Sequence, residues 1–240
     1  MSAASNTKPV CVITGASSGV GLATAELFAR QGHRLALCAR NRRRLDEATE
    51  QIRGQTSPAA DVLAVAADVG DQAEARSFIQ QVGESHGRID VLVNNAGTAP
   101  MAAISEFREE EFQAAMRVNI AAVFATTQAV WPIMQRQARG TIVNISSLAA
   151  IDPFPGLGVY GACKAWVDLF TKAMSAEGSD VGIRTFALRL GAVETPLLRS
   201  LFPDFPPEQT LAPQEVAQVI SQIVTEPFRF ASGEALCLRK

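Results

Sequence analysis

The sequence predicts an α/β fold, in which a doubly wound, seven-stranded parallel sheet carries helices on both faces in a single domain over residues 1–240. Three observations predict it. Short apolar runs alternate with longer amphipathic stretches, which implies right-handed β–α–β crossovers. Most short runs are continuously apolar, as are strands buried on both faces of a parallel sheet. No linker rich in proline, glycine or serine divides the chain, in which 48% of residues are hydrophobic.

The elements follow one another in regular order. The predicted strands are runs rich in Val, Ile, Leu and Ala, and the stretches between them show the apolar spacing of helices. The strands are Val10–Thr14, Arg34–Ala39, Val62–Ala67, Val91–Asn94, Thr141–Ser146, Arg184–Leu188 and Ala235–Leu238. The helices are Val20–Gln31, Asn41–Arg53, Gln72–Ser85, Glu109–Arg136, Tyr160–Glu177 and Pro213–Val224.

One segment departs from this alternation. Residues from about 193 to 213, and Thr195–Pro213 in particular, combine prolines with large apolar side chains such as Leu198 and Phe202. A long connection in a compact domain is typically either a binding lid or disordered, and the apolar content disfavours disorder. We therefore predict a substrate lid. The alternative is a surface connection that packs on the core.

Composition and charge exclude several functional classes. A formal net charge of −2 gives no basis for binding nucleic acid or an anionic membrane. No apolar run approaches the roughly 18 residues that span a bilayer, and residues 1–9 lack the apolar segment of a signal peptide. The four cysteines form no CxxC pair, and His33 and His86 lie beside glycines in polar stretches typical of surface turns. We expect a cytoplasmic protein with no metal site.

The first predicted strand leads directly into a glycine-rich turn that opens a helix. Glycine lets the backbone turn tightly and approach a ligand, and a helix N-terminus offers unpaired N–H groups to a pyrophosphate. The spacing GxxxGxG differs from the common GxGxxG fingerprint, and glycine clusters also occur in plain turns. The place of this turn between strand and helix favours phosphate binding. The residues predicted to bind a cofactor here are Gly15, Ser17, Ser18, Gly19, Val20 and Gly21.

The end of the second strand indicates which nicotinamide cofactor is used. NAD-binding sheets usually place Asp or Glu there to hold the ribose 2′-hydroxyl. Here Ala39 is followed by Arg40 and Asn41, with no acid in reach. Arg40 can make a charge-assisted contact with a 2′-phosphate, so NADP(H) is predicted in preference to NAD(H). The arginines at positions 42–44 are interpreted mostly as a solvated helix start.

The only tyrosine of the chain, Tyr160, precedes Lys164 by four residues. Positions four apart share a helix face, so the phenol and the ammonium group point the same way. A nearby cation lowers the pKa of a phenol from about 10 towards the range useful for proton transfer. Ser147 follows a predicted strand, at the end of a sheet where ligands bind. These three residues form a candidate acid–base site, and the alternative is a buried tyrosine beside an exposed lysine.

Taken together, these motifs resemble those of the short-chain dehydrogenase/reductase family. They occur in the order and spacing of the family and cover nearly the whole chain. The matching segments are TGASSGVG (14–21), Asp68-Val69, NNAG (94–97), Asn119 in RVNI, NISS (144–147) and YGACK (160–164). The resemblance implies a Rossmann fold and an NADP-preferring oxidoreductase.

The resemblance also implies a role for each matching residue. Tyr160 would be the general acid or base, Lys164 would lower its pKa and hold the nicotinamide ribose, and Ser147 would bind the substrate oxygen. Asn119 would hold a water molecule in the proton relay. The remaining cofactor contacts would come from the adenine pocket, the floor after the fourth strand and the loop after the sixth. They are Asp68, Val69, Asn95, Ala96, Gly97, Gly191, Val193 and Thr195.

One position departs from the family pattern. Proline and glycine are usual after the sixth strand, whereas this chain has Arg189, Leu190 and Gly191. Leucine restores a backbone N–H and frees φ, so we expect altered loop stiffness with cofactor binding retained. Arg189 either recognises an anionic substrate or pairs with Glu194 or another acid.

We predict an NADPH-dependent oxidoreductase that reduces a ketone or aldehyde to an alcohol, with an apolar, moderately bulky small molecule as substrate. A β-ketoacyl-carrier-protein reductase is the alternative within this class, although Arg117, Arg136 and Arg139 make only a weak basic surface. A non-enzymatic NADP-binding regulator is the alternative from another class. The family's usual dimer contact uses the two long helices at 109–136 and 160–177, which implies a homotetramer or homodimer.

Overall fold

A seven-stranded parallel sheet forms the centre of the molecule, in the order β3-β2-β1-β4-β5-β6-β7. The computed structural model describes residues 8–225, 228 and 230–240, so most of the N-terminal segment considered for a signal peptide lies outside the described residues. The strands are β1 (Val10–Thr14), β2 (Arg34–Ala39), β3 (Val62–Ala66), β4 (Val91–Asn94), β5 (Gly140–Ser147), β6 (Ile183–Leu190) and β7 (Glu234–Leu238). The predicted fold class is confirmed.

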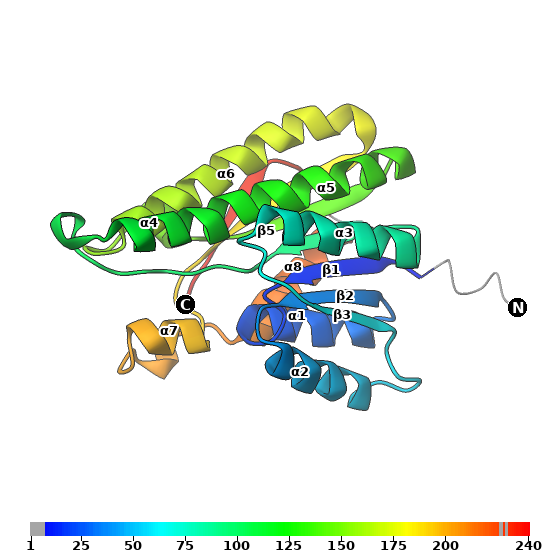
Figure 1. Ribbon diagram of the computed structural model, residues 1–240, viewed down its shortest axis with the longest axis horizontal. Helices are drawn as coiled ribbons and strands as arrows, with labels where there is room; N and C mark the ends of the chain where they lie inside the picture. Colours follow the sequence, from blue (N-terminus) through cyan, green and yellow to red (C-terminus); the bar gives the residue numbers. More distant parts are fainter. Residues whose placement is uncertain (1–7, 226–227, 229) are drawn as a thin grey trace, which may run out of the picture.

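Helices cover both faces of the sheet (Figure 1). On one face lie α1 (Gly19–Arg30), α2 (Arg42–Gly54) and α8 (Pro213–Val224). On the other face lie α3 (Gln72–His86), α4 (Glu109–Met116), α5 (Ala122–Gln137) and α6 (Gly158–Gly178). A separate short helix, α7 (Pro196–Leu201), lies apart from both layers, close in space to the C-terminus. None of the helices in the described residues is long and apolar enough to cross a membrane.

Each face of the sheet has its own hydrophobic core. Phe28 of α1 and Phe186 of β6 belong to the first cluster, and Phe78 of α3 belongs to the second. All three phenylalanines are completely buried. The central strand β1 is buried along its whole length, as its continuous apolar sequence predicts.

The helix predicted over Glu109–Arg136 is divided in the structure. α4 ends at Met116, a π-helical stretch runs over Arg117–Ala121, and α5 follows. A π-helical turn is a single wider turn inside an α-helix, and the helical pattern of the sequence does not show where the hydrogen-bond spacing changes from i+4 to i+5. The stretch contains Asn119, whose side chain is buried.

The placement of His86 also differs from the prediction. It is only 6% exposed, whereas a surface turn was expected. The reason is that His86 is the last residue of α3, and the left-handed residue that ends the helix is Gly87, at φ +71°. The turn is therefore made by the glycine, while the imidazole packs inward.

Candidate active site

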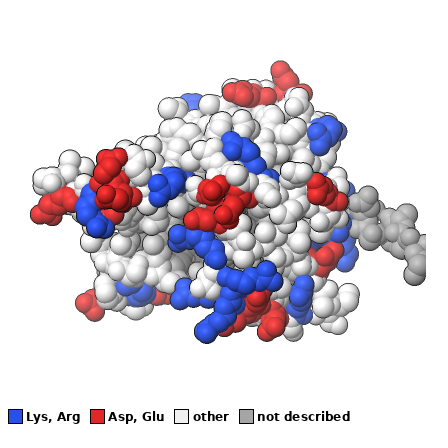
Figure 2. Space-filling view, viewed as in Figure 1, with Lys and Arg blue, Asp and Glu red and all other residues white. Residues whose placement is uncertain are grey.

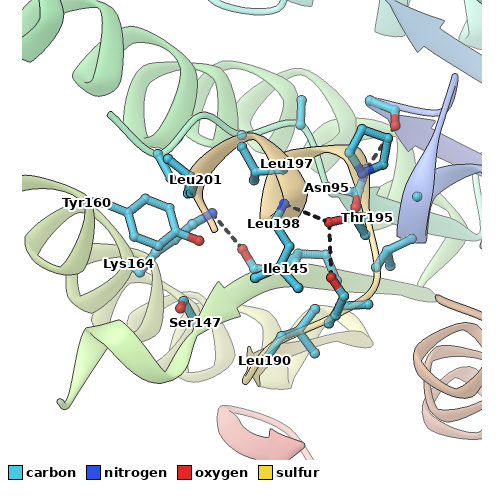
Figure 3. Close-up of a pocket in the computed structure, with 18 of the residues that line it drawn as sticks. Asn95, Ile145, Ser147, Tyr160, Lys164, Leu190, Thr195, Leu197, Leu198 and Leu201 are labelled. Carbon is cyan, nitrogen blue, oxygen red and sulfur yellow. Dashed lines mark hydrogen bonds between the residues drawn. The ribbon is translucent and has the colours of Figure 1, made fainter. Parts of the chain in front are cut away.

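A cavity of about 820 Å³ opens at the carboxyl ends of the strands. Ligands bind at this edge in open α/β sheets. Figure 3 shows Tyr160, Lys164 and Ser147 grouped in the cavity, with α7 beside them. The predicted residues that line it are Gly15, Ser17, Ser18, Gly19, Val20, Arg40, Asn41, Asp68, Val69, Asn95, Ala96, Gly97, Ser147, Tyr160, Lys164, Gly191, Val193 and Thr195. Gly21 and Asn119 are outside this lining.

The glycine-rich turn is tied to the end of β4. Asn95 Nδ2 donates to the carbonyl oxygens of Thr14 and Gly15, at 2.9 and 3.0 Å. Gly15 has φ +65°, and a Cβ there would lie 2.9 Å from the Cα of Ala96. Gly21 lies behind the turn, where a Cβ would collide with the Gly15 carbonyl oxygen. Gly21 thus serves the packing of α1 against the turn, and only its neighbours reach the cavity.

This turn fits a dinucleotide phosphate. α1 begins at Gly19 and its first residues line the cavity. The first backbone N–H groups of a helix have no partner within the helix and carry the positive end of its dipole. The glycine at position 15 lets the turn lie directly against Ala96, and the backbone of the turn borders the cavity. Gly15, Ser17, Ser18 and Gly19 therefore form a cradle suited to an anion.

The basic residues after β2 divide into two groups. Arg42 and Arg43 pair with Asp46 and Glu47, one turn further along α2. Arg40 and Arg44 line the cavity and make no ion pair within the described part of the chain. Figure 2 shows basic and acidic side chains gathered over α2. The interpretation of positions 42–44 as a solvated helix start thus describes the first two, whereas Arg44 contributes to the cavity.

The loop after β3 holds Asp68 in a tight turn at the cavity wall. Asp68 Oδ1 accepts a hydrogen bond from Gly70 N at 2.9 Å. Glu74 Oε2 accepts one from Asp68 N at 2.8 Å. The adjacent Val69 is buried. These contacts fix the two residues where the second and third strands end.

Three candidate catalytic residues converge from β5 and α6. Ser147 is the last residue of β5, and its Oγ accepts a hydrogen bond from Ala149 N at 3.1 Å. Tyr160 lies in the first turn of α6. Lys164 is 4% exposed, and its Nζ donates to the Ile145 carbonyl oxygen at 2.8 Å. The ammonium nitrogen is 5.7 Å from the centroid of the Tyr160 ring.

The electrostatics of Tyr160 differ from the prediction. Burial raises the pKa of the phenol above its usual value, and hydrogen bonding with Ser147 only partly opposes this. We expected Lys164 to lower that pKa. The main reason for the difference is the burial of the phenol, and Lys164, whose ammonium group donates to the Ile145 carbonyl oxygen, does not offset it. Burial also lowers the pKa of Lys164 itself to about 8, so its charge is lost at alkaline pH.

Asn119, the fourth candidate catalytic residue, lies near Lys164 at the loop after β4. It is fully buried in the π-helical stretch, and its Nδ2 donates to the carbonyl oxygens of Thr98 and Ala115, at 2.8 and 3.0 Å. Its Oδ1 accepts from Thr98 N at 3.3 Å. A Cβ at Gly97 would lie 3.1 Å from this oxygen and 3.6 Å from Lys164 Nζ. Asn119 therefore fixes the loop after β4 against Lys164.

Arg189 does not line the cavity. Its Nε donates to Asp168 Oδ2 at 2.7 Å. Of the two predicted roles of Arg189, recognition of an anionic substrate and pairing with an acid, the structure favours the pairing. The acid is Asp168, because Glu194 pairs with Arg199. Leu190, in the place of the usual proline, is buried at the cavity wall.

The segment from 193 to 213 is more ordered than a loop. It contains α7, which Thr195 Oγ1 caps by accepting from Leu198 N at 3.2 Å. A parallel bridge between Val193 and Leu211 closes its base. Its apolar side chains face the cavity, which Leu197, Leu198, Leu201, Phe202 and Phe205 help to line. Arg239 and Lys240 also line the cavity, and neither is among the site residues predicted from the sequence. Both directly follow β7, and their place at the carboxyl end of a predicted strand is the signal that could have identified them.

A profile of the short chain dehydrogenase family matches residues 9–205. The chain belongs to the short-chain dehydrogenase family. Among its relatives, the 3-oxoacyl-[acyl-carrier-protein] reductase of Thermotoga maritima is 35% identical over 236 residues, which covers 95% of this chain and 94% of the relative. Members of this short-chain dehydrogenase family are oxidoreductases, and this chain is accordingly an enzyme that acts on CH–OH or C=O groups.

Solved structures of other short-chain dehydrogenases share the whole fold. A variant of actinorhodin polyketide ketoreductase with NADPH is 28% identical, with a TM-score of 0.91, and the match covers 97% of this chain and 96% of that one. The 3-ketoacyl-(acyl-carrier-protein) reductase of Brucella melitensis complexed with NADH is 29% identical, with a TM-score of 0.87 and 96% of each chain covered. The fold thus binds a nicotinamide cofactor, and the related structures include one complex with NADPH and one with NADH.

Proposed function

We propose that this enzyme uses NADPH to reduce a ketone or aldehyde to an alcohol, and that Tyr160 exchanges the proton. The observation that carries the proposal is the convergence of Ser147, Tyr160 and Lys164 in one cavity that also holds an anion cradle. When bound, the nicotinamide supplies the hydride. The protein supplies orientation and proton transfer.

The catalytic residues divide the work on the carbonyl group. The Tyr160 hydroxyl donates its proton to the substrate oxygen, and Ser147 Oγ donates a hydrogen bond to the same oxygen. In the reverse direction the phenolate accepts the alcohol proton. Lys164 places a positive charge 5.7 Å from the centroid of the ring, and burial of the phenol still keeps the pKa of Tyr160 above its usual value. Asn119 keeps the loop around Gly97 in place beneath the lysine.

We propose NADPH over NADH on the arrangement after β2. Arg40 and Arg44 face the cavity without an ion-pair partner within the described residues, and no carboxylate ends β2. Two guanidinium groups suit a 2′-phosphate. Asn41 and Asp68 would bound the adenosine part.

The apolar segment 193–213 would be the substrate lid. It contributes Leu198, Phe202 and Phe205 to the cavity, and Ile151 and Phe154 line the same space. Such a wall suits an apolar carbonyl compound of moderate bulk. A carrier-protein-bound substrate is the second candidate, favoured by the names of two relatives. Arg139 does not support it, because this arginine pairs with Asp90 at the opposite edge of the sheet.

The test is to replace Tyr160 with Phe and to follow NADPH oxidation with a panel of diketones, quinones, aldehydes, β-ketoesters and a β-ketoacyl thioester. Loss of the hydroxyl removes the proton donor and little volume. We expect turnover to fall by at least about 1000-fold while the Kd for NADPH changes less than about threefold. Equal turnover in the variant would disprove the role of Tyr160. Tight NADPH binding without turnover of any compound in the wild type would favour a regulator.

A cytoplasmic location remains a prediction from the sequence. We also propose that the enzyme forms a homodimer or a homotetramer. The outer faces of α5 and α6 expose Phe124 and Leu169, and Trp166 stacks on Phe170 with ring centroids 4.6 Å apart. An apolar patch of this kind is typical of an interface. Gel filtration of the wild type and of Leu169→Lys should show a smaller species for the variant.

A further inference from the structure

An ion pair lies one helical turn beyond Lys164 and has no part in the reaction described above. Arg189 Nε of β6 donates to Asp168 Oδ2 of α6 at 2.7 Å. The Asp168 side chain is 8% exposed and that of Arg189 is 24% exposed. Since Asp168 follows Lys164 by four residues, the two share a face of α6. The pair therefore joins α6 to β6 next to the catalytic lysine.

Further contacts connect the pair to the strand that carries Ser147. Arg189 is the register partner of Ser146 in the β5–β6 ladder. Ser146 Oγ donates to the Lys164 carbonyl oxygen at 3.3 Å, and Lys164 Nζ donates to the Ile145 carbonyl oxygen at 2.8 Å. Lys164 is thus held by its backbone, by its side chain and, through Asp168, by the next turn of its helix.

The Asp168 carboxylate is only partly engaged. Its Oδ1 is buried and has no hydrogen-bond partner among the residues that the structure describes. Burial lowers the pKa of Lys164 to about 8, and the charges of Cys163 and Asp168 oppose that decrease. A lysine with this pKa is close to losing its proton in the physiological range. The Asp168 carboxylate, one helical turn away, is one of the two groups that favour the charged form of Lys164.

Few titratable or charged groups surround Lys164. The groups are Tyr160, Cys163 and Asp168 on α6, Arg189 on β6 and Cys237 on β7, where Cys237 is the register partner of Arg189. The facing groups of β5 and of the π-helical stretch are Ser146, Ser147 and Asn119, which are neutral. Asp168 is the carboxylate of this group.

We propose that Asp168 is a positioning residue for Lys164: paired with Arg189, it fixes α6 against β6 and keeps the lysine ammonium group charged. This gives a use to Arg189, the residue that departs from the family pattern beside Leu190. The catalytic consequence rests on the proposed function. The charge of Lys164 itself is measurable without turnover, so this inference can be tested independently of the proposed function.

The experiment is a titration of the lysine side chains by NMR, with isotope label at Cε and Nζ. The chain has only Lys8, Lys164, Lys172 and Lys240, and Lys164→Arg identifies the signal of interest. Asp168→Asn removes the negative charge of the carboxylate and leaves the positive charge of Arg189 unpaired. We therefore expect the pKa of Lys164 to fall by about one unit. Arg189→Gln should raise it. The alkaline limb of the kcat/KM profile should move in the same two directions.

The controls separate charge from packing. The double variant Asp168→Asn with Arg189→Gln should titrate near the wild type, and so should Arg189→Lys, which keeps the charge. Asp61→Asn leaves the similarly buried Arg34, 14% exposed, without its carboxylate at the far edge of the sheet. It should leave the Lys164 titration unchanged.

Two results would overturn the inference. One is no shift in Asp168→Asn, and the other is a shift in the same direction for Asp168→Asn and Arg189→Gln, which would mean a structural clamp only. Should Arg189→Gln fail to fold, Arg189→Lys takes its place, and a decrease equal to that of Asp168→Asn would contradict the proposal. If no carbonyl compound is turned over, the proposed function fails while the titration still decides the role of Asp168.

Discussion

Arg40 is the residue on which the proposed preference for NADPH over NADH chiefly depends. It is exposed, it lines the cavity, and it lies directly after β2. Arg43, three residues later, is equally basic but pairs with Glu47. The two arginines therefore provide a matched comparison between a side chain directed to the cavity and one on the outer surface of α2.

Replacing Arg40 with Gln should weaken NADPH binding by about 10- to 100-fold, because one charge-assisted hydrogen bond contributes about 1.5–3 kcal/mol. NADH binding should change little, since NADH has no 2′-phosphate. The Kd values are measurable by fluorescence titration. Arg43→Gln is the control and should leave both unchanged; an equal loss for NADPH and NADH in Arg40→Gln would refute the assignment.

At the scale of elements, the junction of β1 and α1 shows why glycines stand in the turn. The turn must pass close to Ala96, and the helix must begin directly against its backbone. Asn95 completes the junction from β4 with two hydrogen bonds. A side chain behind the turn would push the cradle away from the phosphate site.

Gly21→Ala tests this junction. The added Cβ would collide with the Gly15 carbonyl oxygen, so the turn must shift. We expect weaker binding of both NADPH and NADH and a Tm lower by several degrees, as for an overpacked core site costing about 1–3 kcal/mol. Gly54→Ala, at the end of α2 with open space around it, is the control and should be neutral or slightly stabilising.

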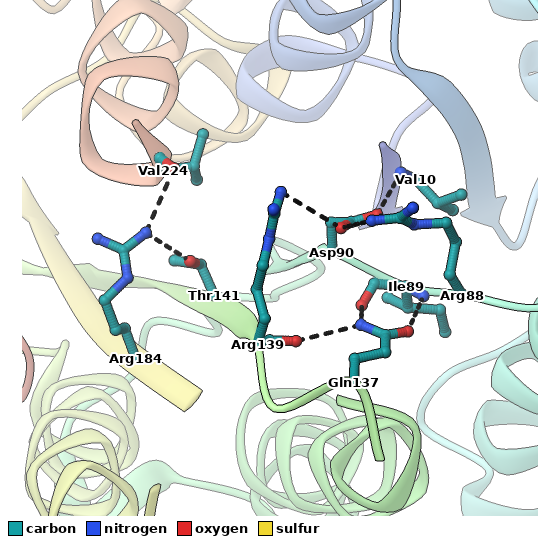
Figure 4. A network of polar contacts seen from close by, with 9 residues as sticks. All are labelled: Val10, Arg88, Ile89, Asp90, Gln137, Arg139, Thr141, Arg184 and Val224. Atoms are coloured by element: carbon teal, nitrogen blue, oxygen red, sulfur yellow. Dashed lines mark hydrogen bonds and ion pairs between the residues drawn. The ribbon is translucent and has the colours of Figure 1, made fainter. Parts of the chain in front are cut away.

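At the scale of the whole molecule, the two edges of the sheet have different tasks. The carboxyl edge holds the cavity, and the opposite edge holds a network around Asp90 (Figure 4). Asp90 Oδ2 accepts from Val10 N and from Arg88 Nε, both at 2.9 Å. Gln137 binds the backbone of Ile89 through both its amide atoms. This network fastens β1, β4 and the end of α5 far from the reaction.

Asp90→Asn should therefore affect stability and not catalysis. Asp90 is buried but Arg88 and Arg139 are 28% and 71% exposed, so the loss is that of a charge-assisted hydrogen bond, about 1.5–3 kcal/mol. We expect a lower midpoint in urea denaturation, measured by far-ultraviolet circular dichroism, and an unchanged kcat/KM per folded molecule. A loss of kcat/KM without loss of stability would contradict this separation of the two edges.

The sequence predicted most of the fold because its signals are local. Continuous apolar runs placed all seven strands, and the lone tyrosine four residues before a lysine led to two residues that line the cavity. The π-helical stretch around Asn119 was not predicted because the change from i+4 to i+5 hydrogen bonding is confined to one turn within a longer helical run. The partner of Arg189 escaped for another reason: Asp168 is 21 residues away, and only the packing of α6 on β6 brings them together.

The direction of the Tyr160 pKa could not be predicted either. Sequence spacing shows that a lysine shares its helix face, but it does not show where the ammonium group points. In the structure Lys164 is bound to the Ile145 carbonyl, and burial dominates the phenol. The balance between burial and a neighbouring charge depends on side-chain direction, which is a property of the folded molecule.

The bridge between Val193 and Leu211 has a consequence for engineering. Glu194 N donates to the Leu211 carbonyl oxygen and Leu211 N to the Ala192 carbonyl oxygen, both at 2.9 Å, so the segment between β6 and α8 begins and ends at one place. Residues 196–210, which leave out the predicted cofactor contact Thr195, are therefore a segment that can be exchanged between two ends that are already joined. Exchanging it for the corresponding piece of a relative should change which carbonyl compounds are accepted, while the nucleotide half of the enzyme stays as it is.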